Sequence, residues 1–199
     1  MLVDPRNYVV PETLKDGTEV TIRAIRADDG ARILEAFNAL DRESIYRRFF
    51  SPKKELSDAE LRQLTEVDSS QVSALVVTTQ KDGVETLLGG GRYAIEGGEW
   101  PQSAELAFLT RGAYRRQGIA SLLLCHLILL AREAGLSRLE ADVLADNQSM
   151  LNVFRRSGLP ITQRRGGNVV HVTLALGDSS LARSASGMGE PDRCPDRRL

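Results

Sequence analysis

The feature that most constrains this chain is the stretch Arg115-Arg116-Gln117-Gly118-Ile119-Ala120, which joins two apolar segments. Residues 104–110, before it, have the pattern of a strand, and residues 121–134, after it, have that of a helix. The first N–H groups of a helix have no partner inside the helix and carry partial positive charge. Because Gly118 and Ala120 have little or no side chain, a ligand can approach the backbone closely. The stretch therefore predicts a phosphate-binding loop at the start of a helix.

The rest of the chain predicts helices interleaved with a largely antiparallel sheet. Alternating or β-branched segments predict strands, and apolar residues at helical spacing predict helices. The expected strands are residues 19–25, 72–79, 85–95, 103–110, 138–144, 161–165 and 169–176. The expected helices begin after Asp29, near Glu43, at Ser57 with Glu60 as its capping box, at Gln117 and at Asn147. This order predicts a single domain of the α+β, or mixed α/β, class.

Two further features concern the backbone and the ends of the chain. The run Gly89-Gly90-Gly91 predicts a bulge or a close backbone contact within its strand. Residues 1–17 are expected to be an irregular lead-in to a domain that spans residues 1–176. Residues 177–199 are rich in Ser, Gly and Pro, with too little apolar surface to offset the entropy of ordering, so they predict a disordered tail.

Composition and charge argue against several classes of partner. A formal net charge of −1 over 199 residues gives no reason to expect a nucleic acid. The longest apolar run, residues 122–131, is too short to cross a bilayer, and no signal peptide opens the chain, so we expect a cytoplasmic protein without a membrane partner. His126 and His171 have no metal-ligand spacing, so no metal site is predicted.

Several motifs together resemble the GNAT superfamily of acyl-CoA-dependent N-acyltransferases. The family's pyrophosphate loop, Q/R-x-x-G-x-G/A, is similar to the stretch that contains Arg115, Gly118 and Ala120. The strand at residues 139–144, the Asn147 that follows it and the Ser157-Gly158-Leu159 step also resemble the family. The resemblance covers residues 17–176. It implies a GNAT fold with six or seven strands flanked by helices, and acetyl-CoA as co-substrate.

A narrower resemblance is to the GNAT domain of bacterial Pat-type protein lysine acetyltransferases. It rests on Leu14-Lys15-Asp16-Gly17-Thr18, on residues 22–26 and 43–50, and on Ala104-Glu105-Leu106-Ala107. It implies a protein lysine as the amine acceptor, with a small amine as the alternative. Those enzymes commonly carry a regulatory domain, for which 199 residues leave no room, which argues against nucleotide regulation and weakens the inference to a protein substrate.

Acetyl transfer to an amine needs a base. A lysine with a pKa near 10.4 is neutral only about once in a few thousand molecules at pH 7. A carboxylate can take its proton directly or through a water molecule. The resemblance gives this catalytic role to Glu105, whose alternative interpretation is an ordinary solvent-facing strand residue.

The resemblance also implies the residues that bind the co-substrate. The pantetheine arm pairs with the strand at residues 103–110 as an added strand would. A backbone N–H of Leu109 or Thr110 serves as the oxyanion donor. The predicted cofactor-binding residues are Leu109, Thr110, Arg115, Arg116, Gln117, Gly118, Ile119, Ala120 and Asn147. Asn147 can equally be a plain helix N-cap.

Some residues keep two interpretations. Phe154 occupies a position where many GNAT enzymes have a tyrosine acid, and it is expected to pack in the core instead. Tyr46, Arg47 and Arg48 can line the acceptor side or form an ordinary helix surface. The whole domain can also be an acyl-CoA-binding sensor without turnover, and either a monomer or a homodimer.

Overall fold

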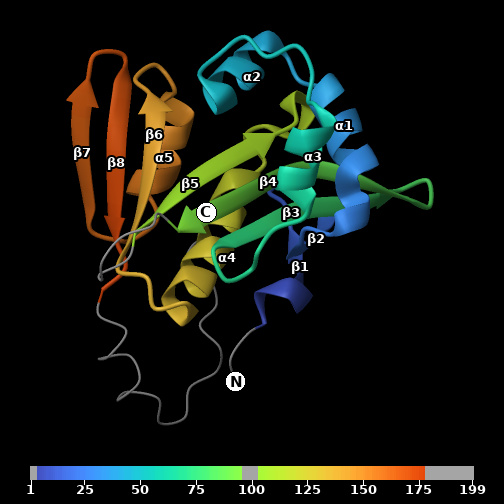
Figure 1. Cartoon of the computed structure of the whole chain (residues 1–199), viewed down its shortest axis with the longest axis horizontal. Helices are drawn as coiled ribbons and strands as arrows, with labels where there is room; N and C mark the ends of the chain where they lie inside the picture. The colour runs from blue at the N-terminus through green and yellow to red at the C-terminus, as the bar shows by residue number, and fades with distance from the viewer. Residues whose placement is uncertain (1–3, 96–102, 178–199) are drawn as a thin grey trace.

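The computed structural model describes residues 4–95 and 103–177 (Figure 1). These residues form one eight-stranded sheet in the order β1-β2-β3-β4-β5-β6-β8-β7. Neighbouring strands are antiparallel, except that β5 and β6 are parallel. The strands are β1 Val9–Thr13, β2 Glu19–Ala24, β3 Val72–Lys81, β4 Val84–Ile95, β5 Ser103–Thr110, β6 Arg138–Leu144, β7 Ile161–Gly166 and β8 Val169–Ala175.

Helices cover both faces of the sheet. Figure 1 shows α1 and α3 in front of the central strands, with α2 above them, and α4 behind the sheet. The α-helices are α1 Gly30–Asn38, α2 Arg42–Phe49, α3 Asp58–Thr65, α4 Ile119–Glu133 and α5 Gln148–Arg155. Short 3-10 helices are η1 Pro5–Asn7, η2 Ala27–Asp29 and η3 Gly112–Tyr114. This arrangement confirms the predicted α+β class.

Local signals in the sequence explain where several helices begin and end. The Ser57 side chain accepts a hydrogen bond from Glu60 N–H, and the Glu60 carboxylate accepts one from Ser57 N–H, which confirms the predicted capping box. The helix α4 ends before Gly135, which has a positive φ of 77°. These are short-range effects, so they can be recognised from the sequence.

The prediction of an irregular lead-in was wrong at β1, which pairs with β2 along its whole length. Pro11 hides this strand in the sequence, because proline cannot donate a ladder hydrogen bond. It is tolerated here because β1 lies at the edge of the sheet. The sheet therefore has one strand more than the upper number expected. The predicted disordered tail, residues 177–199, lies outside the described residues except for Gly177.

A buried polar cluster helps to hold β1 against α4. The Tyr8 hydroxyl contacts His126 Nδ1, and His126 Nε2 lies 3.5 Å from a carboxylate oxygen of Glu12. Burial, with a further contribution from the Glu12 charge, raises the pKa of Tyr8 to about 12. Burial also lowers the pKa of His126, which favours the neutral imidazole there. His126 therefore has a structural role, because it links α4 to Tyr8 and Glu12.

The main core lies between the sheet and the helices α4 and α5. Leu123 and Leu127 of α4 are fully buried against sheet residues such as Leu88 and Leu139. On the other face, Ala36 of α1 packs in a smaller cluster with Val76 and Leu87. The sheet is therefore covered on both sides at its centre, whereas one face of β6, β8 and β7 is exposed.

The glycine run of β4 allows the close packing that the sequence predicted. A Cβ added at Gly91 would lie 2.9 Å from Phe108 Cδ1 and 3.2 Å from Leu127 Cδ1. A Cβ at Gly89 would lie 2.8 Å from the carbonyl oxygen of Leu109. The β3–β4 register also shifts next to Gly89, between Val77 and Thr78. The missing side chains therefore bring β4 close to β5 and α4.

We predict that Gly91→Ala lowers the free energy of unfolding by about 1–3 kcal/mol, because overpacking forces Phe108 or Leu127 to move. Urea denaturation measures this loss. Gly166→Ala is the matched control, since a Cβ there meets no atom within 4 Å, and its stability should be close to that of the wild type. Equal stability of the two variants would contradict the proposed packing role.

Candidate functional site

The candidate site begins where β5 and β6 separate. Their parallel pairing runs from Ser103 opposite Arg138 to Glu105 opposite Glu140, and it stops there. Beyond this point β5 continues along β4 to Thr110, while β6 continues along β8. Figure 1 shows the two strands diverging. The edge of β5 from residue 106 to residue 110 is therefore without a strand partner on its β6 side among the described residues.

The register decides which N–H groups of β5 point to this open edge. Arg111 N–H donates to the Leu88 carbonyl at 2.9 Å. Because hydrogen-bonded positions alternate along an antiparallel ladder, Leu109 N–H faces Gly90 of β4. The N–H groups of Phe108 and Thr110 face the open edge instead. Of the two expected oxyanion donors, Thr110 has its N–H at the open edge and Leu109 does not, and Phe108, which was not among the predicted residues, also has its N–H there.

The loop at residues 115–120, which the sequence predicts to bind phosphate, leads directly into α4. Arg116 and Gly118 have positive φ angles of 67° and 93°, and α4 begins at Ile119. The first hydrogen bond of the helix runs from Leu122 N–H to the Gly118 carbonyl at 3.0 Å. The N–H groups of residues 119–121 therefore have no acceptor within the helix, and they lie at its positive end.

Some charged side chains around this loop are paired within the protein, and others are exposed to solvent. Arg115 donates to Asp41 at 2.7 Å and contacts the Ser44 hydroxyl, so it ties the loop to α2. Arg116 is exposed. Lys15 is also exposed, and its backbone N–H donates to the Gln117 carbonyl at 3.2 Å. A Cβ added at Gly118 would lie 3.6 Å from Lys15 Cγ, so the Lys15 side chain lies over the loop.

Glu105 is exposed on the face of β5 opposite to α4, at the point where the split between β5 and β6 begins. Its neighbour across the parallel pair, Glu140, forms an ion pair with Arg138, with 2.7 Å between Arg138 Nε and Glu140 Oε1. Two arginines lie near it: Arg48 of α2 interacts electrostatically with Glu105, and Arg92 stands opposite Ala107. Glu105 therefore combines access to solvent with a place beside the open edge of β5.

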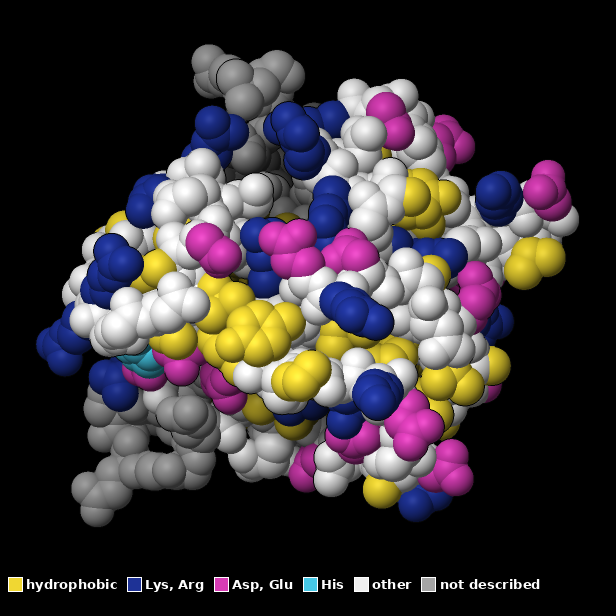
Figure 2. All heavy atoms as spheres, turned by 90° about the horizontal axis from the view of Figure 1, so that it is seen from above, with side chains coloured by type: hydrophobic (Ala, Val, Ile, Leu, Met, Phe, Trp, Pro, Cys, Tyr) yellow, Lys and Arg dark blue, Asp and Glu magenta, His cyan; other side chains and the backbone are white. Residues whose placement is uncertain are grey.

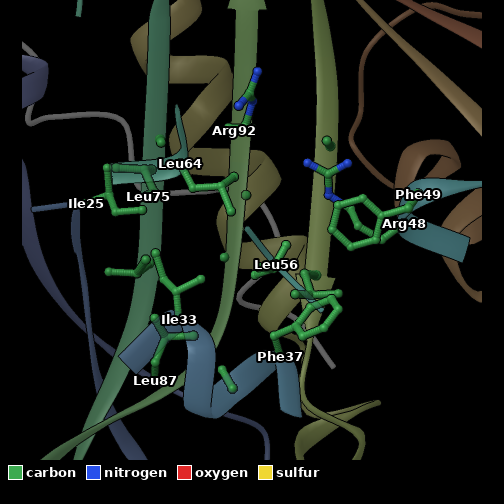
Figure 3. A pocket seen from close by; sticks show the side chains of 17 residues that line it. Ile25, Ile33, Phe37, Arg48, Phe49, Leu56, Leu64, Leu75, Leu87 and Arg92 are labelled. Carbon is green, nitrogen blue, oxygen red and sulfur yellow. The ribbon is translucent and has the colours of Figure 1, made fainter. Parts of the chain in front are cut away.

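A cavity of about 90 Å³ lies on the same face of the sheet, beneath α1, α2 and α3 (Figure 3). Ala107 and Leu109 of β5 form part of its wall. Apolar side chains such as Ile33, Phe37 and Leu64 line most of it, and the charged residues in its lining are Arg48 and Arg92. The cavity thus reaches the strand that carries Glu105.

The residues of α2 differ in how they relate to this cavity. Arg48 lines it. Tyr46 is 44% exposed, and Arg47 is paired with Glu43 at 2.5 Å on the helix surface. On the face that Figure 2 shows, basic and acidic side chains lie beside a band of hydrophobic side chains.

Asn147, the N-cap of α5, and Phe154 within this helix have structural roles. The Asn147 side chain accepts a hydrogen bond from Met150 N–H at 3.3 Å, as an N-cap does. Phe154 is 1% exposed, and its ring centroid lies 6.1 Å from that of Phe108 in an edge-to-face contact. This confirms that Phe154 packs in the core, and a phenyl ring has no proton to donate.

Within residues 4–95 and 103–177, no three His, Cys, Asp or Glu side chains are grouped so that they could hold a metal ion. His171 pairs with Asp142 at 2.9 Å on the exposed face of the sheet. In the same part of the chain, no helix has the length and apolar character needed to span a membrane.

Comparisons with known proteins agree with this geometry. The acetyltransferase PA5475 of Pseudomonas aeruginosa is 33% identical over 141 residues, which are 70% of this chain and 74% of that protein. The acetyltransferase Pat of Mycolicibacterium smegmatis is 31% identical over 149 residues, which are 75% of this chain but only 44% of Pat. The crystal structure of the GNAT domain of S. lividans PAT has a TM-score of 0.75 and 32% identity, covering 84% of this chain and 96% of that one.

The family model described as the Acetyltransferase (GNAT) family matches residues 39–159, from just before α2 to just beyond α5. This range contains Glu105, the open edge of β5 and the loop at residues 115–120. The match and the relatives confirm the expected fold and the similarity to Pat. The chain therefore belongs to the GNAT family of acetyltransferases, with acetyl-CoA as its co-substrate.

Proposed function

We propose that this protein transfers the acetyl group of acetyl-CoA to a primary amine by direct attack in a ternary complex, with Glu105 as the general base. The observation that carries the proposal is the place of Glu105. It is exposed where β5 and β6 separate, on the strand whose N–H groups at Phe108 and Thr110 face the open edge.

In the proposed reaction the neutral amine attacks the thioester carbonyl. A carbon–nitrogen bond forms, the carbon–sulfur bond breaks, and Glu105 takes the amine proton directly or through a water molecule. The N–H groups of Phe108 and Thr110 are placed to stabilise the oxyanion of the tetrahedral intermediate. Phe154 cannot protonate the departing thiolate, which leaves as such or takes a proton from water, since a thiol has a pKa near 8.5.

The same proposal assigns the binding of acetyl-CoA. The pantetheine arm adds to the open edge of β5 as a strand would. The pyrophosphate accepts hydrogen bonds from N–H groups of residues 116–120, and the exposed charges of Arg116 and Lys15 add to this site. Arg115 has a different task, because its guanidinium is paired with Asp41. Asn147 remains a predicted contact of the CoA arm as well as an N-cap.

The acceptor class has two candidates. The similarity to Pat-type enzymes favours a protein lysine, and a small amine is the alternative. The chain spans less than half of the M. smegmatis Pat that it matches, so the substrate of that whole protein is not transferred to this chain. The cytoplasmic location and the oligomeric state, monomer or homodimer, stay predictions from the sequence.

A CoA-release assay tests the proposal. Acetyl-CoA is mixed with the protein and a panel of lysine peptides, polyamines and amino acids, and free CoA is measured together with the N-acetylated product. We expect equal amounts of both with at least one class of amine. Tight binding of acetyl-CoA without CoA release from any amine would favour the alternative function, an acyl-CoA sensor.

We predict that Lys15→Gln and Arg116→Gln each raise KM for acetyl-CoA by roughly 3- to 10-fold with little change in kcat, because each removes one exposed charge beside the pyrophosphate. Steady-state kinetics at low ionic strength measures the effect, which should shrink as salt is added. Lys81→Gln, at the exposed β3–β4 hairpin, is the matched control. Unchanged KM in both test variants would contradict this part of the site.

A further inference from the structure

Two arginines break the apolar lining of the cavity beneath α1, α2 and α3. Arg48 comes from α2 and Arg92 from β4. Figure 3 shows both guanidinium groups on the same side of the pocket, away from Phe37 and Leu87. The two positive charges are close enough to affect each other, since Arg92 contributes to lowering the pKa of Arg48, after burial as the larger cause.

Neither guanidinium has a carboxylate partner within 4 Å among the described residues. Other arginines near this face do have one, including Arg23, Arg32 and Arg111. Arg48 lies over the Phe49 ring at 5.0 Å, and Glu105 opposes part of its charge from a longer distance. Both arginines are partly buried beside mostly apolar side chains, so a bound anion can compensate their positive charges.

The position of this charge relative to Glu105 restricts the acceptor. An acceptor amine must approach Glu105 to lose its proton, so a second group of the same molecule can reach the arginines. A planar carboxylate is the group that guanidinium forks bind most specifically. The cavity of about 90 Å³ is lined mostly by apolar side chains, so it suits a short aliphatic side chain. An unmodified lysine side chain would bring an apolar stem but no negative charge.

We propose that Arg48 and Arg92 bind the carboxylate of a small amine acceptor whose short apolar side chain fills the cavity, as in an aliphatic amino acid. This inference rests on the proposed function and narrows its acceptor from amines in general to amino-carboxylates. In this proposal Arg48 and Arg92 determine the acceptor specificity, and Glu105 takes the proton from the amine.

Leucine and leucinamide are a matched pair of acceptors for the test, because they differ in the carboxylate alone. The quantity to compare is the ratio of kcat/KM for leucine to that for leucinamide. The amine pKa of the two compounds differs, but this difference is the same for every enzyme variant and cancels between them. We expect the ratio to fall by roughly 10- to 100-fold in Arg92→Gln and Arg48→Gln relative to the wild type, as for loss of a charged hydrogen bond.

The controls separate binding from folding. Arg62→Gln, on the exposed surface of α3, should keep the wild-type ratio. Arg48→Lys and Arg92→Lys keep the charge and should retain part of the ratio, which a merely misfolded variant would not do. The KM for acetyl-CoA and the thermal midpoint of each variant should stay near those of the wild type.

The outcomes also separate this inference from the proposed function. A ratio that is the same in the wild type and both Gln variants, or a lysine peptide that outcompetes leucine, would overturn the inference and leave acetyl transfer intact. Calorimetric titration of leucine into the CoA-bound protein adds a readout without turnover. Leucine binding that both Gln variants lose, without CoA release from any amine, would support the carboxylate site and contradict the transferase.

Discussion

Glu105→Gln should lower kcat by about 100- to 10,000-fold at pH 7, while KM for acetyl-CoA stays within about threefold of the wild type. The amide keeps the size of the carboxylate but cannot take a proton. Acetyl-CoA binding should be preserved, because the open edge of β5 and the loop before α4 are formed by backbone groups. Steady-state kinetics with a saturating amine measures both constants.

The pH dependence of the same variant gives a second test. Without a base, only the free amine reacts, so the rate of Glu105→Gln should rise about tenfold per pH unit below the pKa of the amine. The wild type should depend on pH less steeply over this range. Glu140→Gln is the control, because Glu140 is the neighbour of Glu105 across the β5–β6 pair and should matter far less. Equal rates for Glu105→Gln and the wild type would remove Glu105 from the mechanism.

Asp29→Asn should lower the free energy of unfolding by about 3–5 kcal/mol, the largest loss of stability that we expect from a single substitution. Asp29 is fully buried and receives two hydrogen bonds of 2.7 Å from Arg23, itself 2% exposed. Arg23 also donates to Glu85 at 2.8 Å, so the network joins β2, η2 and β4. Removing one charge leaves a buried guanidinium that is only partly compensated.

The loss should depend on pH. Burial acts to raise the pKa of the Asp29 carboxyl, but hydrogen bonds from Arg23 and Arg26 and the arginine charges hold it below its usual range. A carboxyl whose pKa is lowered by folding adds stability above its unfolded pKa, near 3.9, and this stability is lost as the pH falls through the folded value. The difference between wild type and variant should thus be complete at pH 7 and shrink below about pH 4.

Urea denaturation at pH 7 and at low pH measures this dependence. Asp28→Asn is the matched control, because the Asp28 side chain is 73% exposed and 3.9 Å from its arginine partner. Its stability should stay within about 0.5 kcal/mol of the wild type. A similar loss in the two variants would show that the buried pair is not what stabilises this corner of the fold.

Short-range chemistry made much of the fold predictable. The capping box at Ser57 and Glu60 and the glycine after α4 act within one helical turn. The strand β1 was missed because it depends on pairing with β2 and on the contact between Tyr8 and His126, which lie 118 positions apart in the chain. An edge strand that contains proline gives almost no signal before its partner is known.

In the candidate site, too, local features could be predicted from the sequence and long-range ones could not. Glu105 and the loop at residues 115–120 belong to local sequence motifs, so they could be proposed as site residues without knowledge of the packing. The direction of the Phe108 N–H depends on the register of β5 against β4, and the pairing of Arg115 with Asp41 depends on how α2 packs. Arg48 of α2 and Arg92 of β4 line the same cavity because of how α2 packs on the sheet. The orientation and the partners of these residues depend on long-range packing, which cannot be predicted from the sequence pattern.

A single-turnover experiment tests the central claim most directly. Protein in excess over acetyl-CoA that is isotopically labelled in its acetyl carbonyl is mixed with an amine, and mass spectrometry follows the label. Direct attack in a ternary complex predicts that the label passes to the N-acetylamine in step with the release of CoA, and that the protein is never acetylated. Label on the protein before it reaches the amine, or CoA release without an N-acetylated product, would contradict it.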